Sequence, residues 1–195
     1  TDRPPADSDT AATAQGADLE TASAGVPDPA LTADPQTQVI VIDASVPFAD
    51  DLLADIPPAW TVIRLQADRD GLSQLTEALG DRGDLSAIHI FSHGSAGRIT
   101  LGSFDLTTEN MASRAADLAA LGQHLSTSGD LLLYGCNVAA DFAGKTFVDQ
   151  LATLTQADIA ASDDATGNTV FGGDWGLEAR TGAVEAQSLT DDQYR

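Results

Sequence analysis

Short apolar runs and helical spacings alternate along this chain from residue 39 onwards. Runs typical of buried strands cover 39–43, 60–65, 87–91, 131–134 and 159–161, and a sixth strand is expected at 176–179. Apolar residues spaced three or four apart predict helices at 47–56, 71–79, 111–124 and 140–154. Strands that alternate with helices are typical of parallel crossovers. We therefore expect an α/β domain with a mainly parallel central sheet and helices on both faces.

Three stretches depart from that alternation. Residues 98–106 alternate around a Gly-Ser turn and predict a small hairpin. Residues 1–38 are mostly Ala, Thr, Asp and Pro, and they carry too little apolar surface to offset the entropy of ordering. We expect a disordered acidic leader or linker there, an ordered domain over 39–187, and a flexible polar tail over 188–195.

The strong negative charge of the chain limits the classes of molecule that it could bind. Its 9 Lys and Arg stand against 30 Asp and Glu, which gives a formal net charge of −21. Such acidity argues against nucleic acid and against anionic membrane surfaces, because both need Lys and Arg. No apolar run approaches the roughly 20 residues of a membrane span, so no membrane insertion is expected. The acidity is compatible with calcium, but the chain has no Asp-x-Asp-x-Asp-Gly loop and no His/Cys cluster for zinc, so no metal ligand is assigned.

Two of the predicted strands end alike, in a small polar turn that contains glycine. His93-Gly94 follows the run 87–91, and Cys136, the single cysteine, follows the run 131–134. Open α/β sheets carry their sites just beyond the carboxyl ends of the strands, so both side chains should reach one edge. A thiol and an imidazole there are the parts of a cysteine nucleophile and its base. The plainer interpretations are a turn-capping histidine and a small buried cysteine.

The residues around these two turns resemble those of a known group. Ser92-His93-Gly94 and Tyr134-Gly135-Cys136-Asn137 are similar to the catalytic motifs of the caspase-like cysteine peptidases, which include caspases, gingipains, clostripain, separases and self-processing toxin domains. The pattern over about 39–187 also resembles a domain near the N-terminus of very large bacterial surface adhesins with cadherin-like or calcium-binding repeats. The Gln-Ala-Cys-x-Gly form of caspases is missing, so caspase specificity is not implied.

The resemblance implies a fold, an activity and a location. The fold would be a caspase-like three-layer sandwich, and the activity that of a cysteine endopeptidase outside the bacterial cell or on its surface. Cys136 would be the nucleophile, His93 the acid and base, and the N–H groups of Gly94 and Cys136 the oxyanion hole. The substrate would be a polypeptide, either its own chain or its parent adhesin, and no cofactor is required. The alternative is a catalytically silent adhesin module that serves folding, retention or surface interaction.

Three more residues are candidates for substrate binding. Asp163 follows the fifth predicted strand, where related peptidases place part of a pocket, and its carboxylate would select Arg or Lys before the scissile bond; Asp is also common in plain turns. Asp43 either lines the same edge or caps the next helix. Trp175 either walls the cleft or is a buried aromatic. His89 lies inside a strand and favours a core role, and His124 ends a predicted helix, so neither is assigned to chemistry.

Overall fold

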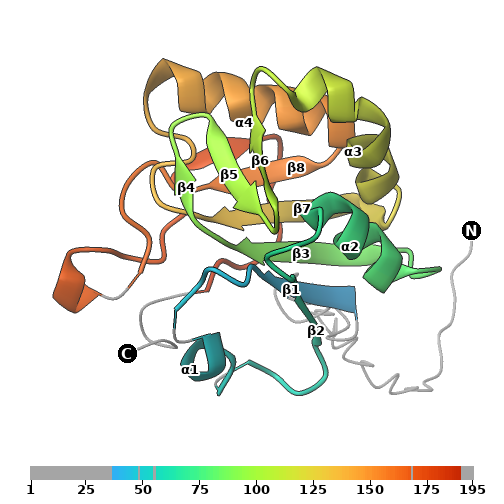
Figure 1. The fold of residues 1–195 in the computed structure, drawn as a ribbon, viewed down its shortest axis with the longest axis horizontal. Coiled ribbons are helices and arrows are strands. Elements are labelled where there is room, and N and C mark those ends of the chain that lie inside the picture. The colour runs from blue at the N-terminus through green and yellow to red at the C-terminus, as the bar shows by residue number, and fades with distance from the viewer. Residues whose placement is uncertain (1–36, 48, 55, 168, 190–195) are drawn as a thin grey trace, which may run out of the picture.

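The computed structural model describes residues 37–189 except 48, 55 and 168, so most of the predicted leader and tail lies outside the described residues. The main sheet has the strand order β2-β1-β3-β7-β8-β9 (Figure 1). Its strands are β1 (Gln38–Ile42), β2 (Thr61–Arg64), β3 (Leu85–Phe91), β7 (Leu125–Tyr134), β8 (Asp158–Ala161) and β9 (Ala179–Thr181). Every neighbouring pair is parallel except β8 and β9. The predicted mainly parallel α/β sheet is therefore confirmed.

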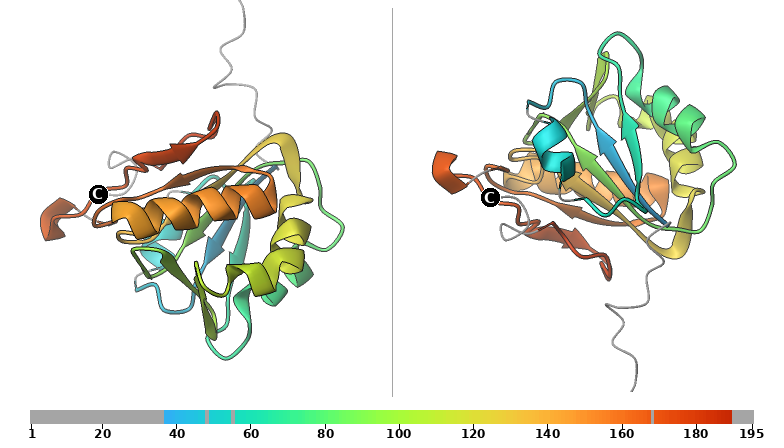
Figure 2. Two further views of the ribbon diagram at one scale, coloured as in Figure 1. Left: turned by 90° about the horizontal axis from the view of Figure 1, so that it is seen from above. Right: turned by 90° about the horizontal axis from the view of Figure 1, so that it is seen from below.

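Helices cover both faces of this sheet, as expected. The α-helices are α1 (Ala49–Ala54), α2 (Gly71–Leu79), α3 (Ala115–Gly122) and α4 (Asp141–Thr155), and the 3-10 helices are η3 (Met111–Arg114) and η4 (Thr169–Phe171). The helices α2, α3 and α4 pack on one face, and α1 packs on the other together with the C-terminal segment (Figures 1 and 2). This arrangement is consistent with a three-layer sandwich. None of the helices in the described ranges has the length and apolar character needed to cross a bilayer.

Alternate residues of each central strand enter two separate cores. In β1, Val39 and Val41 pack under α2 and α3, whereas Ile40 and Ile42 pack on the side of α1. All four are at most 2% exposed. Burial of one such side chain contributes roughly 1.5–3 kcal/mol, so the continuous apolar runs of the sequence hold both layers to the sheet.

The predicted hairpin is present within a second, smaller sheet. The strands β4 (Gly94–Ser95), β5 (Arg98–Leu101) and β6 (Phe104–Thr107) pair antiparallel. Because β4 begins directly after His93, this small sheet fixes the backbone on one side of the candidate histidine.

The structure departs from the sequence pattern in three places. The predicted helix 111–124 is divided into η3 and α3 and ends at Gly122, where a side chain would overlap the Thr155 carbonyl. The strand β7 begins at Leu125 rather than near 131. Its first half is not predicted, because it is polar and shows no apolar run. The sixth strand lies at 179–181 rather than 176–179 and runs antiparallel to β8.

The described start of the predicted tail is packed rather than loose. Leu189 is 5% exposed, and its N–H donates a hydrogen bond of 2.9 Å to the Tyr134 hydroxyl. The packed chain therefore extends beyond 187, the boundary that composition predicts, because a single apolar residue can anchor an otherwise polar segment.

Candidate functional site

The strand order places a switch point at the centre of the main sheet. From β1 the chain moves outward to β2 on one side and then to β3 on the other. In open α/β sheets, ligands bind beyond the carboxyl ends of the strands at such a point. His93 and Cys136 follow the adjacent parallel strands β3 and β7, whose last residues Phe91 and Tyr134 lie opposite each other. Both candidate residues therefore leave the sheet at the same edge, as the sequence predicts.

The two turns that carry these residues pack against one another. The Ser92 N–H donates to the Tyr134 carbonyl at 3.2 Å, which continues the strand pairing past the end of β3. A Cβ built on Gly94 would lie 3.2 Å from the Cys136 carbonyl oxygen and would overlap the Val138 side chain. Only glycine allows this approach of the two backbones. The sequence places His93 directly before that glycine, and its side chain is exposed.

Cys136 lies on a sharp turn. Asn137 has a φ of +59°, a left-handed conformation that Asn adopts more readily than most residues. The thiol is partly buried, and it donates a hydrogen bond to the Thr166 carbonyl at a sulfur–oxygen distance of 3.6 Å. The turn therefore brings the sulfur to the sheet edge, where it faces the loop after β8.

The loop after β8 is fastened to the cysteine turn. The Asn137 N–H donates to the Asp164 carbonyl at 2.6 Å, and the Ala139 N–H donates to the Ser162 carbonyl at 2.9 Å. Asp163 is exposed between these two anchors. Its N–H donates to the Glu178 carboxylate at 3.2 Å. The structure therefore places the predicted selector Asp163 on a segment directly bonded to the Cys136 turn.

Trp175 belongs to the core beside this edge. Its ring lies 6.0 Å from that of Phe91 and 6.4 Å from that of Tyr134, centroid to centroid. It is partly exposed and packs against the core on the α1 side of the sheet. This is the packing role that the plainer interpretation expects, and a wall for substrate at Trp175 stays a prediction.

Asp43 ties three segments together. It is 2% exposed, and its Oδ1 accepts hydrogen bonds from the Ser45 N–H, at 2.9 Å, and from the Ser45 hydroxyl. Its Oδ2 accepts a bond of 2.6 Å from the Gly102 N–H in the hairpin turn. Asp43 thus caps a turn before α1 rather than α1 itself. Both of its oxygens already accept bonds from the protein, which disfavours the predicted substrate contact.

His89 has the core role that its position favours. It is fully buried, with Nε2 2.9 Å from the Gln38 side-chain oxygen and Nδ1 3.4 Å from the Tyr134 hydroxyl. Its ring lies between those of Trp60 and Tyr134. Burial lowers the pKa of His89 to about 3, so the imidazole is neutral at physiological pH. It cannot supply the proton transfer that we expect of His93.

Two groups of three acidic residues in the described part of the chain could hold a metal ion, since one carboxylate oxygen from each residue lies within 4.8 Å of the others. The first, which we call the exposed acidic group, is Asp163, Asp164 and Glu178. The second, which we call the buried acidic group, is Asp130, Asp158 and Glu185. Of these six residues, the sequence pattern singles out only Asp163. Asp164 is the neighbour of Asp163 in the same turn, and the remaining four were missed because residues far apart in the chain meet only in the folded structure.

These features define an α/β domain with a histidine and a cysteine on neighbouring turns at the carboxyl edge of its sheet. Comparison with known families identifies the family to which the domain belongs. The family described as a domain of unknown function, DUF4347, matches residues 39–194, and the chain belongs to this family. No curated protein matches the chain. The family carries no assigned activity, so the peptidase and adhesin interpretations stay proposals.

Proposed function

We propose that this domain is a caspase-like cysteine endopeptidase in which Cys136 is the nucleophile and His93 the acid and base. One observation carries the proposal: the turns that hold these two residues touch one another at the carboxyl edge, next to the switch point of the sheet. Gly94 supports this contact, because any side chain there would force the turns apart.

The reaction follows from these positions. His93 takes the thiol proton, and the Cys136 thiolate attacks the scissile carbonyl to form a tetrahedral oxyanion. The N–H groups of Gly94 and Cys136 stabilise that oxyanion; within the described residues, no acceptor takes the Cys136 N–H. His93 then gives its proton to the leaving amine, and water hydrolyses the thioester. The thiol must first leave the Thr166 carbonyl, which substrate binding would bring about.

The exposed acidic group gives the proposed specificity. Asp163 and Asp164 place two carboxylates on the loop fastened to the Cys136 turn, and Glu178, directly before β9, adds a third beside it. A cationic side chain before the scissile bond would neutralise that charge through charge-assisted hydrogen bonds. We therefore propose a preference for Arg or Lys. The substrate is proposed to be the domain's own polypeptide or its parent adhesin, outside the cell or at its surface.

A second candidate function, a catalytically silent adhesin module, is favoured by one observation. The Cys136 thiol donates its hydrogen bond to the Thr166 carbonyl, which is not a base that could activate the nucleophile. In a silent module this bond would be permanent, and His93 would be an exposed turn residue only.

Labelling with peptidyl electrophiles separates the two candidates. We expect a chloromethyl ketone that carries Arg to modify Cys136 in the wild type, detected as a mass shift in the peptide that contains it. His93→Ala should slow labelling by at least tenfold, and Cys136→Ala should abolish it. A small alkylating reagent serves as the control for simple access to the thiol. If that reagent reacts while the peptidyl probe does not, or if His93→Ala reacts at the wild-type rate with both, the silent module is correct.

A further inference from the structure

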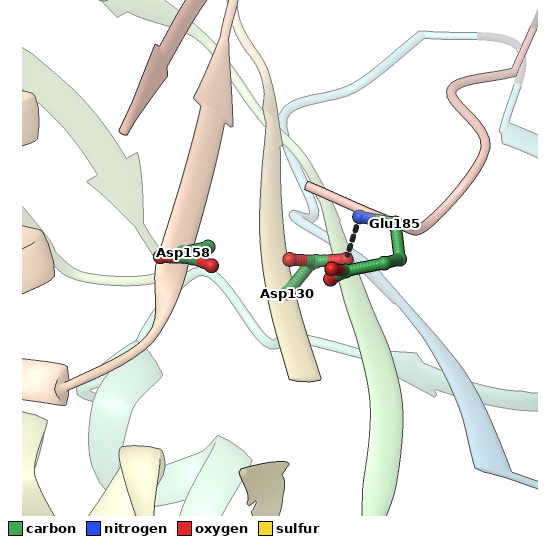
Figure 3. A group of neighbouring side chains, drawn as sticks. All are labelled: Asp130, Asp158 and Glu185. Carbon is green, nitrogen blue, oxygen red and sulfur yellow. Dashed lines mark hydrogen bonds between the residues drawn. The ribbon is translucent and has the colours of Figure 1, made fainter. Parts of the chain in front are cut away.

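The buried acidic group lies at the amino-terminal side of the paired strands, away from the Cys136 edge. Asp130 in β7 and Asp158 in β8 are direct partners in the parallel register, and Glu185 comes from the C-terminal segment (Figure 3). From Asp130 to Tyr134 the strand rises roughly 13 Å, at about 3.3 Å per residue, and Cys136 lies beyond that. This group is therefore separate from the candidate active site.

One buried carboxylate oxygen in this group has no hydrogen-bond partner among the described residues. Asp130 is completely buried, and its Oδ2 accepts hydrogen bonds from the Glu185 N–H at 2.9 Å and the Ala186 N–H at 2.7 Å. Its Oδ1 is also buried, and no partner for it exists in the described part of the chain. Figure 3 shows this second oxygen on the side of Asp158. A buried carboxylate oxygen without a partner is unfavourable by about 1–3 kcal/mol or more.

The side chains next to that oxygen are also acidic, so a cation bound there would relieve the repulsion between like charges. The Asp158 and Glu185 carboxylates are both within the same 4.8 Å group, so like charges surround Asp130. None of the ion pairs among the described residues involves any of the three. Asp158 is itself fixed, because its Oδ2 accepts a bond of 3.0 Å from the Ala183 N–H. The backbone therefore holds both aspartates in place without neutralising them.

We propose that Asp130, Asp158 and Glu185 bind one calcium ion, which fastens the C-terminal segment to the sheet. An all-oxygen donor set favours hard cations over zinc or copper. Calcium accepts six to eight oxygen ligands in a flexible geometry, whereas magnesium demands a near-ideal octahedron and keeps several of its waters, so a group of carboxylates supplied by the protein favours calcium. Glu185 is exposed and Asp158 partly so, which leaves a path for entry and room for water ligands.

The competing occupant is a proton. Burial raises the pKa of Asp130 to about 6, and the nearby Glu185 and Asp158 charges act in the same direction. Without a cation, the carboxyl could thus carry a proton and donate it within the group. The two occupants differ in one measurable respect, because only the ion makes stability depend on calcium concentration.

The test is calcium binding by the whole chain at pH 7.5 after removal of metals with a chelator. We expect one ion per chain by titration calorimetry, and a rise in Tm of about 5–10 °C at a hundredfold excess over Kd. Asp130→Asn, which keeps an acceptor for both N–H groups, should weaken binding by at least tenfold. Glu185→Gln, at an exposed position, should weaken it as well and guards against a folding defect in the first variant.

The matched control lies in the other acidic group: Asp163→Asn should leave the high-affinity site unchanged. The proposal is overturned if calcium does not raise the Tm of the wild type, if magnesium does so equally at the same concentration, or if both Asp130→Asn and Glu185→Gln keep the full response. No calcium response, together with a metal-free wild type that gains stability as the pH falls through about 6 while Asp130→Asn does not, identifies the proton as the occupant. None of these results depends on peptidase activity.

Discussion

The two acidic groups have the same kind of side chains, but one of them contains a buried member, Asp130. Asp163, Asp164 and Glu178 are exposed, so water and salt screen their charge and the folded state tolerates them at little cost. Asp130 is completely buried and has an oxygen without a protein partner in the described chain. Burial therefore decides what a carboxylate group can do. We therefore expect the exposed acidic group to bind a ligand transiently, and the buried acidic group to hold a bound ion or a proton.

His89 in β3 and His93 in the turn after it show the same contrast between a buried and an exposed side chain. This contrast gives the largest expected effect on stability. His89 is buried and has a pKa of about 3, below its unfolded value near 6.5. The folded state therefore disfavours the charged form. This cost is absent above about pH 6.5 and grows as pH falls toward 3, reaching about 3 kcal/mol of lost stability at about pH 4.5.

Urea unfolding at pH 7 and pH 4.5 measures that loss. His89→Gln should lose about 3 kcal/mol less than the wild type between the two pH values, because it cannot become charged. His93→Gln, at the exposed position, should behave as the wild type does. Equal acid sensitivity in all three proteins would contradict the contrast between buried and exposed side chains.

The second expected effect concerns the hydrogen bonds of Asp130. Asp130→Ala leaves the Glu185 and Ala186 N–H groups without their acceptor, whereas Asp130→Asn keeps one. We expect the alanine variant to be less stable than the asparagine variant by about 2 kcal/mol in metal-free buffer. Chemical unfolding of both variants tests this. A difference below about 0.5 kcal/mol would show that the C-terminal segment does not depend on these bonds.

The smallest effect on stability is expected in the exposed acidic group, together with a change in activity. Asp163→Asn should change the free energy of unfolding by no more than about 0.5 kcal/mol. If the proposed peptidase is correct, the same variant should lower kcat/KM for substrates with Arg before the scissile bond by about tenfold, and leave substrates with an uncharged residue there unaffected. Equal losses for both substrate classes would remove Asp163 from specificity while leaving the roles of His93 and Cys136 open to test.

Much of the architecture could be predicted from local sequence pattern. The apolar runs at 39–43 and 87–91 correspond to β1 and β3, and the helical spacing at 71–79 matches α2 residue for residue. The turns of His93 and Cys136 could be placed because an apolar run that stops at glycine marks a strand end. The start of β7 could not be predicted, because only Leu125 of its first half has a partner in β3, and the regular pairing resumes at Asp130 after a register shift.

The sequence by itself determined which segments are buried and which chemistry-bearing side chains stand at strand ends, because both follow from spacing over a few residues. Only the tertiary structure decided which of those side chains have neighbours. Glu178 joins Asp163, Gly102 occupies an oxygen of Asp43, and Glu185 meets Asp130 across 55 positions of the chain. Such meetings depend on how the sheet is ordered and how the C-terminal segment returns across it. The local sequence pattern does not predict these contacts, because a carboxylate looks the same in the sequence whether water, a backbone N–H or an ion is its partner.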